Sequence, residues 1–146
     1  MSFAQLLGWT ATILFSIALI PLVQSLGVSG EVTLNGGVYY KCSIDSIIEI
    51  TDHNTFIHGN GSIIYGCGLN DKGINTDSES GIKNNVTITD LIIYNVTTGI
   101  LLKGHDNTIN NVTIITADTG SSLNKIGLKI ITANNTITNT YISGGN

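Results

Sequence analysis

The chain has 146 residues, of which 42% are hydrophobic and 11% charged, and its net charge of -4 includes six lysines and no arginine. This length allows one domain with a short leader. A nucleic-acid-binding face requires clustered basic residues, and the sequence contains no such cluster, so we exclude nucleic acid as a partner.

The first element is an apolar stretch, residues 3–23, that contains no charged side chain. Its length suits either a membrane-spanning helix or a signal peptide. The small Ser25 and the break at Pro21 favour cleavage, but no basic residue precedes Lys41, so the usual positive n-region is missing. We expect a hydrophobic helix in residues 1–25 that is either a signal peptide or a membrane anchor, with a buried core helix as the third alternative.

A local duplication follows in the next forty residues. The segment Asn35–Cys42 (NGGVYYKC) matches Asn60–Cys67 (NGSIIYGC) with a constant offset of 25, which places the two cysteines of the chain at equivalent positions. Adjacent strands lie close enough for a disulfide, and export would place the cysteines in an oxidising compartment. We predict a Cys42–Cys67 disulfide, with two stacked free thiols as the alternative.

Three apolar columns repeat through the rest of the chain, each with one member per unit. Their members are Ile57, Ile88, Ile109 and Ile137; then Ile64, Ile93, Ile114 and Ile142; and then Gly73-Ile74, Gly99-Ile100 and Gly127-Leu128. Such repeats indicate a solenoid, because each unit is too small to bury its own apolar face. Short runs rich in Ile, Val and Thr, separated by Asn and Gly, favour strands over helices.

We therefore predict an all-β domain in residues 26–146: a single-stranded parallel β-helix of about four to five rungs, with the isoleucines stacked inside at the strand spacing of about 4.8 Å. The last rung ends at Gly144-Gly145-Asn146 without an evident cap. An open rung presents unpaired strand edges. We expect it to self-associate, to meet a partner, or to mark a fragment of a longer helix.

The repeat units also have a family resemblance. The residues that carry it are Asp52–Gly66 (DHNTFIHGNGSIIYG), Gly73-Ile74, Asn85–Ile88, Gly99–Leu102 and Asn107–Ile109. This pattern resembles the right-handed parallel β-helix repeats of the NosD-like and CASH families, over roughly residues 31–146. The resemblance implies a right-handed coil and an association with carbohydrate binding and sugar hydrolysis, and for NosD itself with copper processing in the periplasm.

Sugar-cleaving enzymes of this fold supply one set of candidate catalytic residues. Gly73–Asp77 (GINTD) resembles a polygalacturonase segment whose aspartate is catalytic, and Gly104-His105-Asp106 is similar to the Gly-His-Gly of that family. The family's paired aspartate is replaced by Val96-Thr97-Thr98, and a lyase-type arginine base is absent. Glycoside hydrolysis requires two carboxylates. Asp77 and His105 are therefore candidates only if the chain is an enzyme, polygalacturonase-like or lyase-like, or a fragment of one.

Two polar excursions, residues 66–83 and 116–126, are expected to be loops that could carry a binding face. In the first of them, Asp71, Asp77 and Glu79 are candidate substrate contacts. Their carboxylates would also suit calcium, the one cofactor that we consider.

The offsets of the tyrosines place Tyr40, Tyr65 and Tyr94 in one column. We expect this column to be buried in the core. If it were exposed, Tyr65 and Tyr94 would form a sugar-stacking platform.

The three histidines, His53, His58 and His105, are expected at surface turns, with His53 and His105 on the same edge. They have no close ligand spacing, so we predict no metal site, although a copper accessory protein would have to use them. Glycosylation sequons occur five times, at Asn60, Asn85, Asn95, Asn111 and Asn134. The repeat itself also calls for Asn and Thr at its turns.

These observations favour an exported, noncatalytic β-helix module, secreted or at the cell surface, that binds a glycan or builds a surface structure. It would be attached to the membrane through residues 3–23 if that stretch is not cleaved. The alternatives are a polysaccharide-cleaving enzyme and a NosD-like copper accessory protein.

Overall fold

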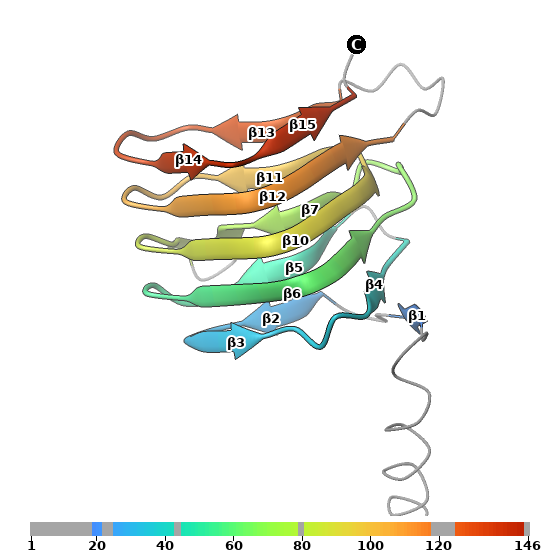
Figure 1. The fold of residues 1–146 in the computed structure, drawn as a ribbon. Helices are drawn as coiled ribbons and strands as arrows, with labels where there is room; N and C mark the ends of the chain where they lie inside the picture. Colours follow the sequence, from blue (N-terminus) through green and yellow to red (C-terminus); the bar gives the residue numbers. More distant parts are fainter. Residues whose placement is uncertain (1–18, 22–24, 43–44, 79–80, 118–124, 145–146) are drawn as a thin grey trace, which may run out of the picture.

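The computed structural model describes residues 19–21, 25–42, 45–78, 81–117 and 125–144. Figure 1 shows a coil of strands stacked in levels, with the chain climbing from the first level to the last. Within the described residues every element is a strand. The predicted all-β parallel solenoid is confirmed, with about four turns. Its right-handed sense remains a prediction from the resemblance.

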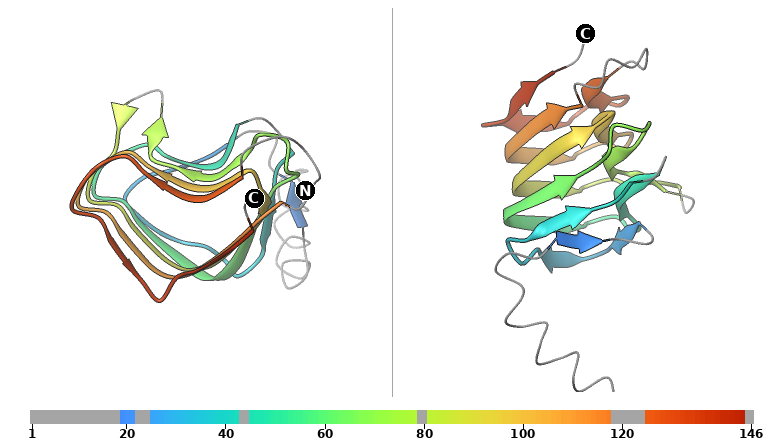
Figure 2. Two further views of the ribbon diagram at one scale, coloured as in Figure 1. Left: turned by 90° about the horizontal axis from the view of Figure 1, so that it is seen from above. Right: turned by 90° about the vertical axis from the view of Figure 1, so that its right-hand side faces the viewer.

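Two parallel sheets form the walls of the coil. Sheet A has eight strands: β1 (Leu19–Pro21), β3 (Glu31–Thr33), β4 (Val38–Tyr40), β6 (Phe56–Tyr65), β10 (Thr87–Val96), β12 (Thr108–Thr116), β14 (Thr136–Thr138) and β15 (Tyr141–Ser143). Sheet B has five: β2 (Leu26–Val28), β5 (Ser46–Ile50), β7 (Lys72–Asn75), β11 (Thr98–Leu102) and β13 (Ile126–Ile130). Seen along the coil axis, successive levels overlay one another around a common interior (Figure 2).

The apolar N-terminal stretch is only partly described. Residues 1–18 and 22–24, most of the predicted helix, lie outside the described residues. Leu19–Pro21 form strand β1, which pairs in parallel with β4, so the prediction of helix is wrong for these three residues. Pairing with the edge of sheet A provides hydrogen-bond partners for the backbone of these residues. Hydropathy along the chain cannot predict such a contact with a distant strand. No described helix is long and apolar enough to cross a bilayer.

The registers confirm the predicted columns. Ile88 of β10 pairs with Ile57 below and Ile109 above, and Ile93 pairs with Ile64 and Ile114 in the same way. All six side chains have no solvent-exposed surface, as the stacked interior requires. In sheet B the third column continues from Ile48 through Ile74, Ile100 and Leu128.

The glycines of the third column allow the two sheets to approach one another. A Cβ on Gly73 would lie 2.6 Å from Cγ2 of Ile93, and Cβ atoms on Gly99 and Gly127 would overlap Ile114 and Ile142. The isoleucines of sheet A therefore pack directly on the backbone of sheet B. A side chain at these positions would have to displace the opposite column.

The bends between strands use asparagine and aspartate. All ten described non-glycine residues with positive φ are of these two types: Asn54, Asn60, Asn70, Asn85, Asp90, Asn95, Asp106, Asn111, Asn134 and Asn139. These residues tolerate the left-handed region better than other side chains, because their short polar groups bond locally. The corners of the coil thus use asparagine on most levels and aspartate at Asp90 and Asp106.

The segment 66–83 differs from the expected open loop. Its middle part, Lys72–Asn75, is strand β7 of sheet B, and only the short antiparallel hairpin of β8 (Asp77–Ser78) and β9 (Gly81–Ile82) projects from the coil (Figure 2). The third column had already included Gly73-Ile74 of this strand, so the expectation of a loop is wrong for the four buried or half-buried residues of β7. Most of the second predicted loop, residues 116–126, lies outside the described residues.

Adjacent isoleucines of β10 offer a matched test of the stacked interior. Ile93 is fully buried, whereas Ile92 points outward and is partly exposed. We expect Ile93→Ala to lower the free energy of unfolding by about 2 to 5 kcal/mol, because it leaves a cavity between two levels. Ile92→Ala should cost well under half as much. If urea denaturation showed that both variants lose the same free energy of unfolding, the placement of Ile93 inside and Ile92 outside would be contradicted.

Candidate functional site

The alternation of each strand defines an outer face of sheet A opposite the core. On the strand segments that follow the bend, two outward columns are mainly apolar or aromatic, and the first of them continues to the polar Thr113 on β12. Their members are Val38, Ile63 and Ile92 in one column and Tyr40, Tyr65, Tyr94 and Ile115 in the next, and we call this set the outer strip. Six of the seven side chains are partly buried, and Tyr94 is 42% exposed.

The tyrosines of the outer strip stack on one another. The ring centroids are 5.7 Å apart between Tyr40 and Tyr65 and 5.5 Å apart between Tyr65 and Tyr94, with tilted planes. The prediction of a single column is therefore confirmed, but its expected burial in the core is wrong. Tyr39 occupies the inward column below Ile64, and the pleat turns the next residue of each strand outward.

The outer strip is bordered by a polar column where sheet A bends. Its members share positive φ values and occupy the same corner on successive levels: Asn60, Asp90, Asn111 and Asn139, which we call the bend column. The register between β6 and β10 shifts at this point. Tyr94 lies four positions after Asp90, or about 13 Å along an extended strand.

Two shallow depressions meet at Asp90. One, of about 320 Å³, is lined by Thr33, His58, Asn60 and Asp90. The other, of about 200 Å³, is lined by Gly61, Asp90, Leu91, Ile92, Asn111 and Thr113. Ile92 belongs to both the second depression and the outer strip, so the polar and apolar surfaces are continuous.

Asp90 carries an exposed, ionised carboxylate. Asn111 Nδ2 donates to its Oδ1 at 2.8 Å. This hydrogen bond is the main reason that the pKa of Asp90 lies below its ordinary value; Thr89 and the nearby His58 act in the same direction, and slight desolvation opposes them. Within the described residues, Asp90 has no ion-pair partner.

Sheet A is free of fixed positive charge. Its strands contain no lysine, and its acidic residues are Asp90 and Glu31, whose Oε1 lies 3.5 Å from Nε2 of His58. The lysines that lie in strands, Lys72 and Lys129, belong to sheet B. The outer face of sheet A around the bend therefore favours neutral or cationic ligands over anions.

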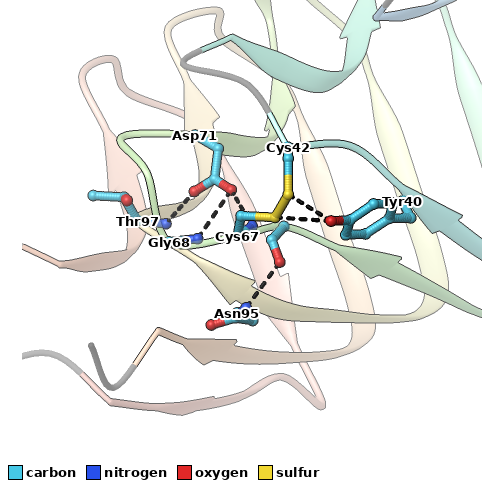
Figure 3. The surroundings of a disulfide bond; sticks show 8 residues. Tyr40, Cys42, Cys67, Gly68, Asp71, Asn95 and Thr97 are labelled. Carbon is cyan, nitrogen blue, oxygen red and sulfur yellow. Dashed lines mark hydrogen bonds between the residues drawn. A yellow bond between two sulfur atoms is a disulfide. The ribbon is translucent and has the colours of Figure 1, made fainter. Parts of the chain in front are cut away.

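The acidic residues expected in the 66–83 loop serve other roles. Asp71 is 1% exposed and accepts hydrogen bonds from the backbone amides of Cys67, Gly68 and Thr97 at 2.7 to 3.2 Å (Figure 3). It ties two levels together, and its burial is at odds with the predicted substrate contact. Asp77 forms an ion pair with Lys103. Glu79 lies outside the described residues.

The structure brings no metal-ligand cluster together among the described residues. His53 and His105 share one edge, as predicted, but they lie two levels apart with Asn84 between them. The backbone amide of Asn84 donates to Nδ1 of His53, and its side-chain oxygen accepts from the amide of His105, both at 3.1 Å. Nδ1 of His105 also contacts Asp106 at 2.7 Å.

The five sequon asparagines all occupy left-handed turn positions: Asn60, Asn85, Asn95, Asn111 and Asn134. The turns of the coil therefore account for asparagine at each sequon. Asn95 Nδ2 donates to the carbonyl of Gly66 at 2.9 Å, and Asn85 Nδ2 donates to Asn54 at 2.7 Å. Occupancy by glycans stays a prediction.

The predicted disulfide is confirmed. Cys42 and Cys67 are bonded across adjacent levels, with their Cα atoms 5.1 Å apart, and neither is a free thiol. The hydroxyl of Tyr40 lies against both sulfur atoms (Figure 3). The disulfide therefore fixes the first tyrosine of the outer strip.

Comparison with known proteins finds no matching family model, curated protein or solved structure. The sequence indicated Tyr65 and Tyr94 but not Asp90 or Thr33. It predicted His58 at a surface turn, which is wrong, because His58 lies within strand β6. The repeat could have indicated Asp90. It stands two residues after Ile88, and the equivalent position of the next unit is Asn111, an uncharged residue.

The disulfide should account for a measurable share of stability, because it closes a loop of 25 residues. We expect the double variant Cys42→Ser, Cys67→Ser to be less stable than the oxidised chain by about 3 kcal/mol in urea denaturation. Reducing the native chain should give the same loss, and reductant should leave the double variant unchanged. Equal stability of the oxidised and reduced native chain would contradict the prediction.

Proposed function

We propose that this chain is an exported, noncatalytic module that binds a polysaccharide across the outer face of sheet A. The observation that carries the proposal is the partly exposed tyrosine column beside a polar bend. The aliphatic C–H face of a sugar ring packs on aromatic and apolar surface, while its hydroxyl groups require polar partners nearby. The outer strip and the bend column offer these two kinds of surface side by side.

The shape of the surface favours an extended ligand. The outer strip runs over four successive levels of β4, β6, β10 and β12, so a chain of sugar rings could contact several levels at once. The depressions at Asp90 add hydrogen-bonding groups from Thr33, Asn60, Asn111 and Thr113. Rigid strands hold these groups, so little ordering cost accompanies binding.

Two features support the noncatalytic and exported parts of the proposal. Asp77, the carboxylate expected in a hydrolase, is engaged by Lys103, and Asp71 is engaged by three backbone amides. Neither is held as one member of a pair that could flank a glycosidic bond. The disulfide supports an oxidising compartment outside the cytoplasm.

Binding to insoluble polysaccharides tests this proposal. We expect the oxidised chain to bind at least one of chitosan, chitin, cellulose or a β-glucan without releasing soluble sugar. Tyr94→Ala should weaken that binding about three- to tenfold, because it removes the most exposed ring of the strip. Ile82→Ala, at a 49% exposed position in the β8–β9 hairpin, is the control and should bind normally. Failure of the folded chain to bind any polysaccharide would contradict the proposal.

A second candidate function, assembly into a surface structure, is favoured by the last level of the coil. Ile130 and Ile142 continue inward columns, yet they are 42% and 43% exposed, whereas Leu102 and Ile114 directly below them have no exposed surface. We propose that a second copy of the chain stacks on this level. The first level of a copy offers Leu26 and Val32, partly buried apolar residues on parallel strands, for such a head-to-tail contact.

Sedimentation velocity tests the assembly candidate. We expect the native chain to self-associate with increasing concentration, and Ile130→Asp to reduce this association, because a charge in the contact must be desolvated. Ile82→Asp places the same charge on the hairpin and should associate like the native chain. A native chain that stays monomeric, or an Ile130→Asp variant that is folded and associates normally, would contradict the stacking.

A further inference from the structure

We infer that the bend of sheet A around Asp90 binds the protonated amino group of an amino-sugar polysaccharide, so that the ligand class is cationic rather than neutral or uronate. This inference rests on the proposed function and specifies the ligand of the same outer face. It is carried by the charge of Asp90, by its place between two depressions, and by the tyrosines farther along the same strand.

The turn geometry does not require a charge at this position. The bend column has asparagine at Asn60, Asn111 and Asn139, and all four members adopt φ between 48° and 58°. An uncharged amide therefore serves the same bend on the other levels. The carboxylate of Asp90 is an addition that the fold itself does not explain.

Among the described residues Asp90 forms no ion pair, and the one charged group that acts on it from nearby is His58, which lies closer to Glu31. Asp106 is the one aspartate in a second column of turn residues, Asn54, Asn85, Asp106 and Asn134, and it contacts the His105 ring at 2.7 Å. Asp77 pairs with Lys103. Asp90 instead receives the neutral amide of Asn111. That hydrogen bond favours the ionised form, so the charge persists in mildly acidic solution.

The surroundings of Asp90 suit a cation on a sugar scaffold. The strands of sheet A contain no lysine, and Glu31 adds a second negative charge near His58. A uronate chain would meet repulsion here, whereas an ammonium group could donate to Asp90. About 13 Å farther along β10, the ring of Tyr94 offers both a stacking surface and a cation–π contact to neighbouring amino sugars.

The test uses two soluble probes that differ only in acetylation: a glucosamine hexamer and an N-acetylglucosamine hexamer, measured by calorimetry at mildly acidic pH. We expect the native oxidised chain to bind the glucosamine hexamer at least tenfold more tightly, and an oligogalacturonate of the same length to show no binding. Asp90→Asn should abolish the preference for glucosamine, because it removes the charge and keeps the amide-type bend of the neighbouring levels.

Asp106→Asn is the matched control. It changes the net charge by the same amount at a residue with nearly the same backbone conformation, φ 59° compared with 58° at Asp90. It should leave the preference for glucosamine intact, which separates a local contact from general attraction to an acidic protein. A preference that survives Asp90→Asn, or falls equally in Asp106→Asn, would overturn the inference.

The outcomes also separate the inference from the proposed function. Equal binding of both hexamers, weakened by Tyr94→Ala but unchanged by Asp90→Asn, would overturn the cationic ligand and leave glycan binding in place. No binding of either hexamer or of the insoluble polysaccharides by the folded chain would overturn both.

Discussion

The packing of isoleucine against glycine across the interior is the constraint on which the rest of this structure depends. Ile93 and Ile114 of sheet A reach the backbone of sheet B because Gly73 and Gly99 have no side chain. This contact sets the separation of the two sheets and keeps each level in register with the next. Because the register is specified by buried residues, a slip of one position would turn the isoleucine columns toward solvent.

The outer face follows from the same constraint. Once Ile64, Ile93 and Ile114 are fixed inside, their neighbours in each strand must point outward, and these neighbours include Tyr65, Tyr94 and Ile115. A solenoid therefore copies one outward position onto every level. Repetition of a residue type there creates a continuous surface, and a change of type at one level, as at Asp90, creates a local feature on it.

The corners of the coil illustrate how one residue type can serve two purposes. Asparagine at positive φ satisfies the turn, and its side-chain amide bonds to the level below or above, as Asn111 does to Asp90 and Asn85 to Asn54. The same asparagines complete glycosylation sequons. In a coil of this kind, the sequence alone therefore does not distinguish an Asn-x-Thr unit that forms a turn from one that carries a glycan.

Much of the fold could be predicted from the sequence, because the repeat is local and periodic. The isoleucine columns, the glycine column and the offset of 25 residues between Cys42 and Cys67 were all readable, since equivalent residues of stacked units must meet. The prediction was weaker where periodicity is interrupted. Polar neighbours hid the extent of strand β7, of which the sequence showed only Gly73-Ile74, and β1 depends on an edge that only the folded sheet provides.

The candidate site was harder to predict, and the reason is geometric. The sequence by itself determined which residues repeat and which pairs of levels they join, because these depend on spacing along the chain. Only the tertiary structure decided that the tyrosines face outward, that Asp71 is enclosed by backbone amides, and that Asp90 accepts from Asn111 but forms no ion pair within the described part of the chain. Exposure and charge pairing depend on the neighbouring levels and on the bend of sheet A, which spacing does not encode.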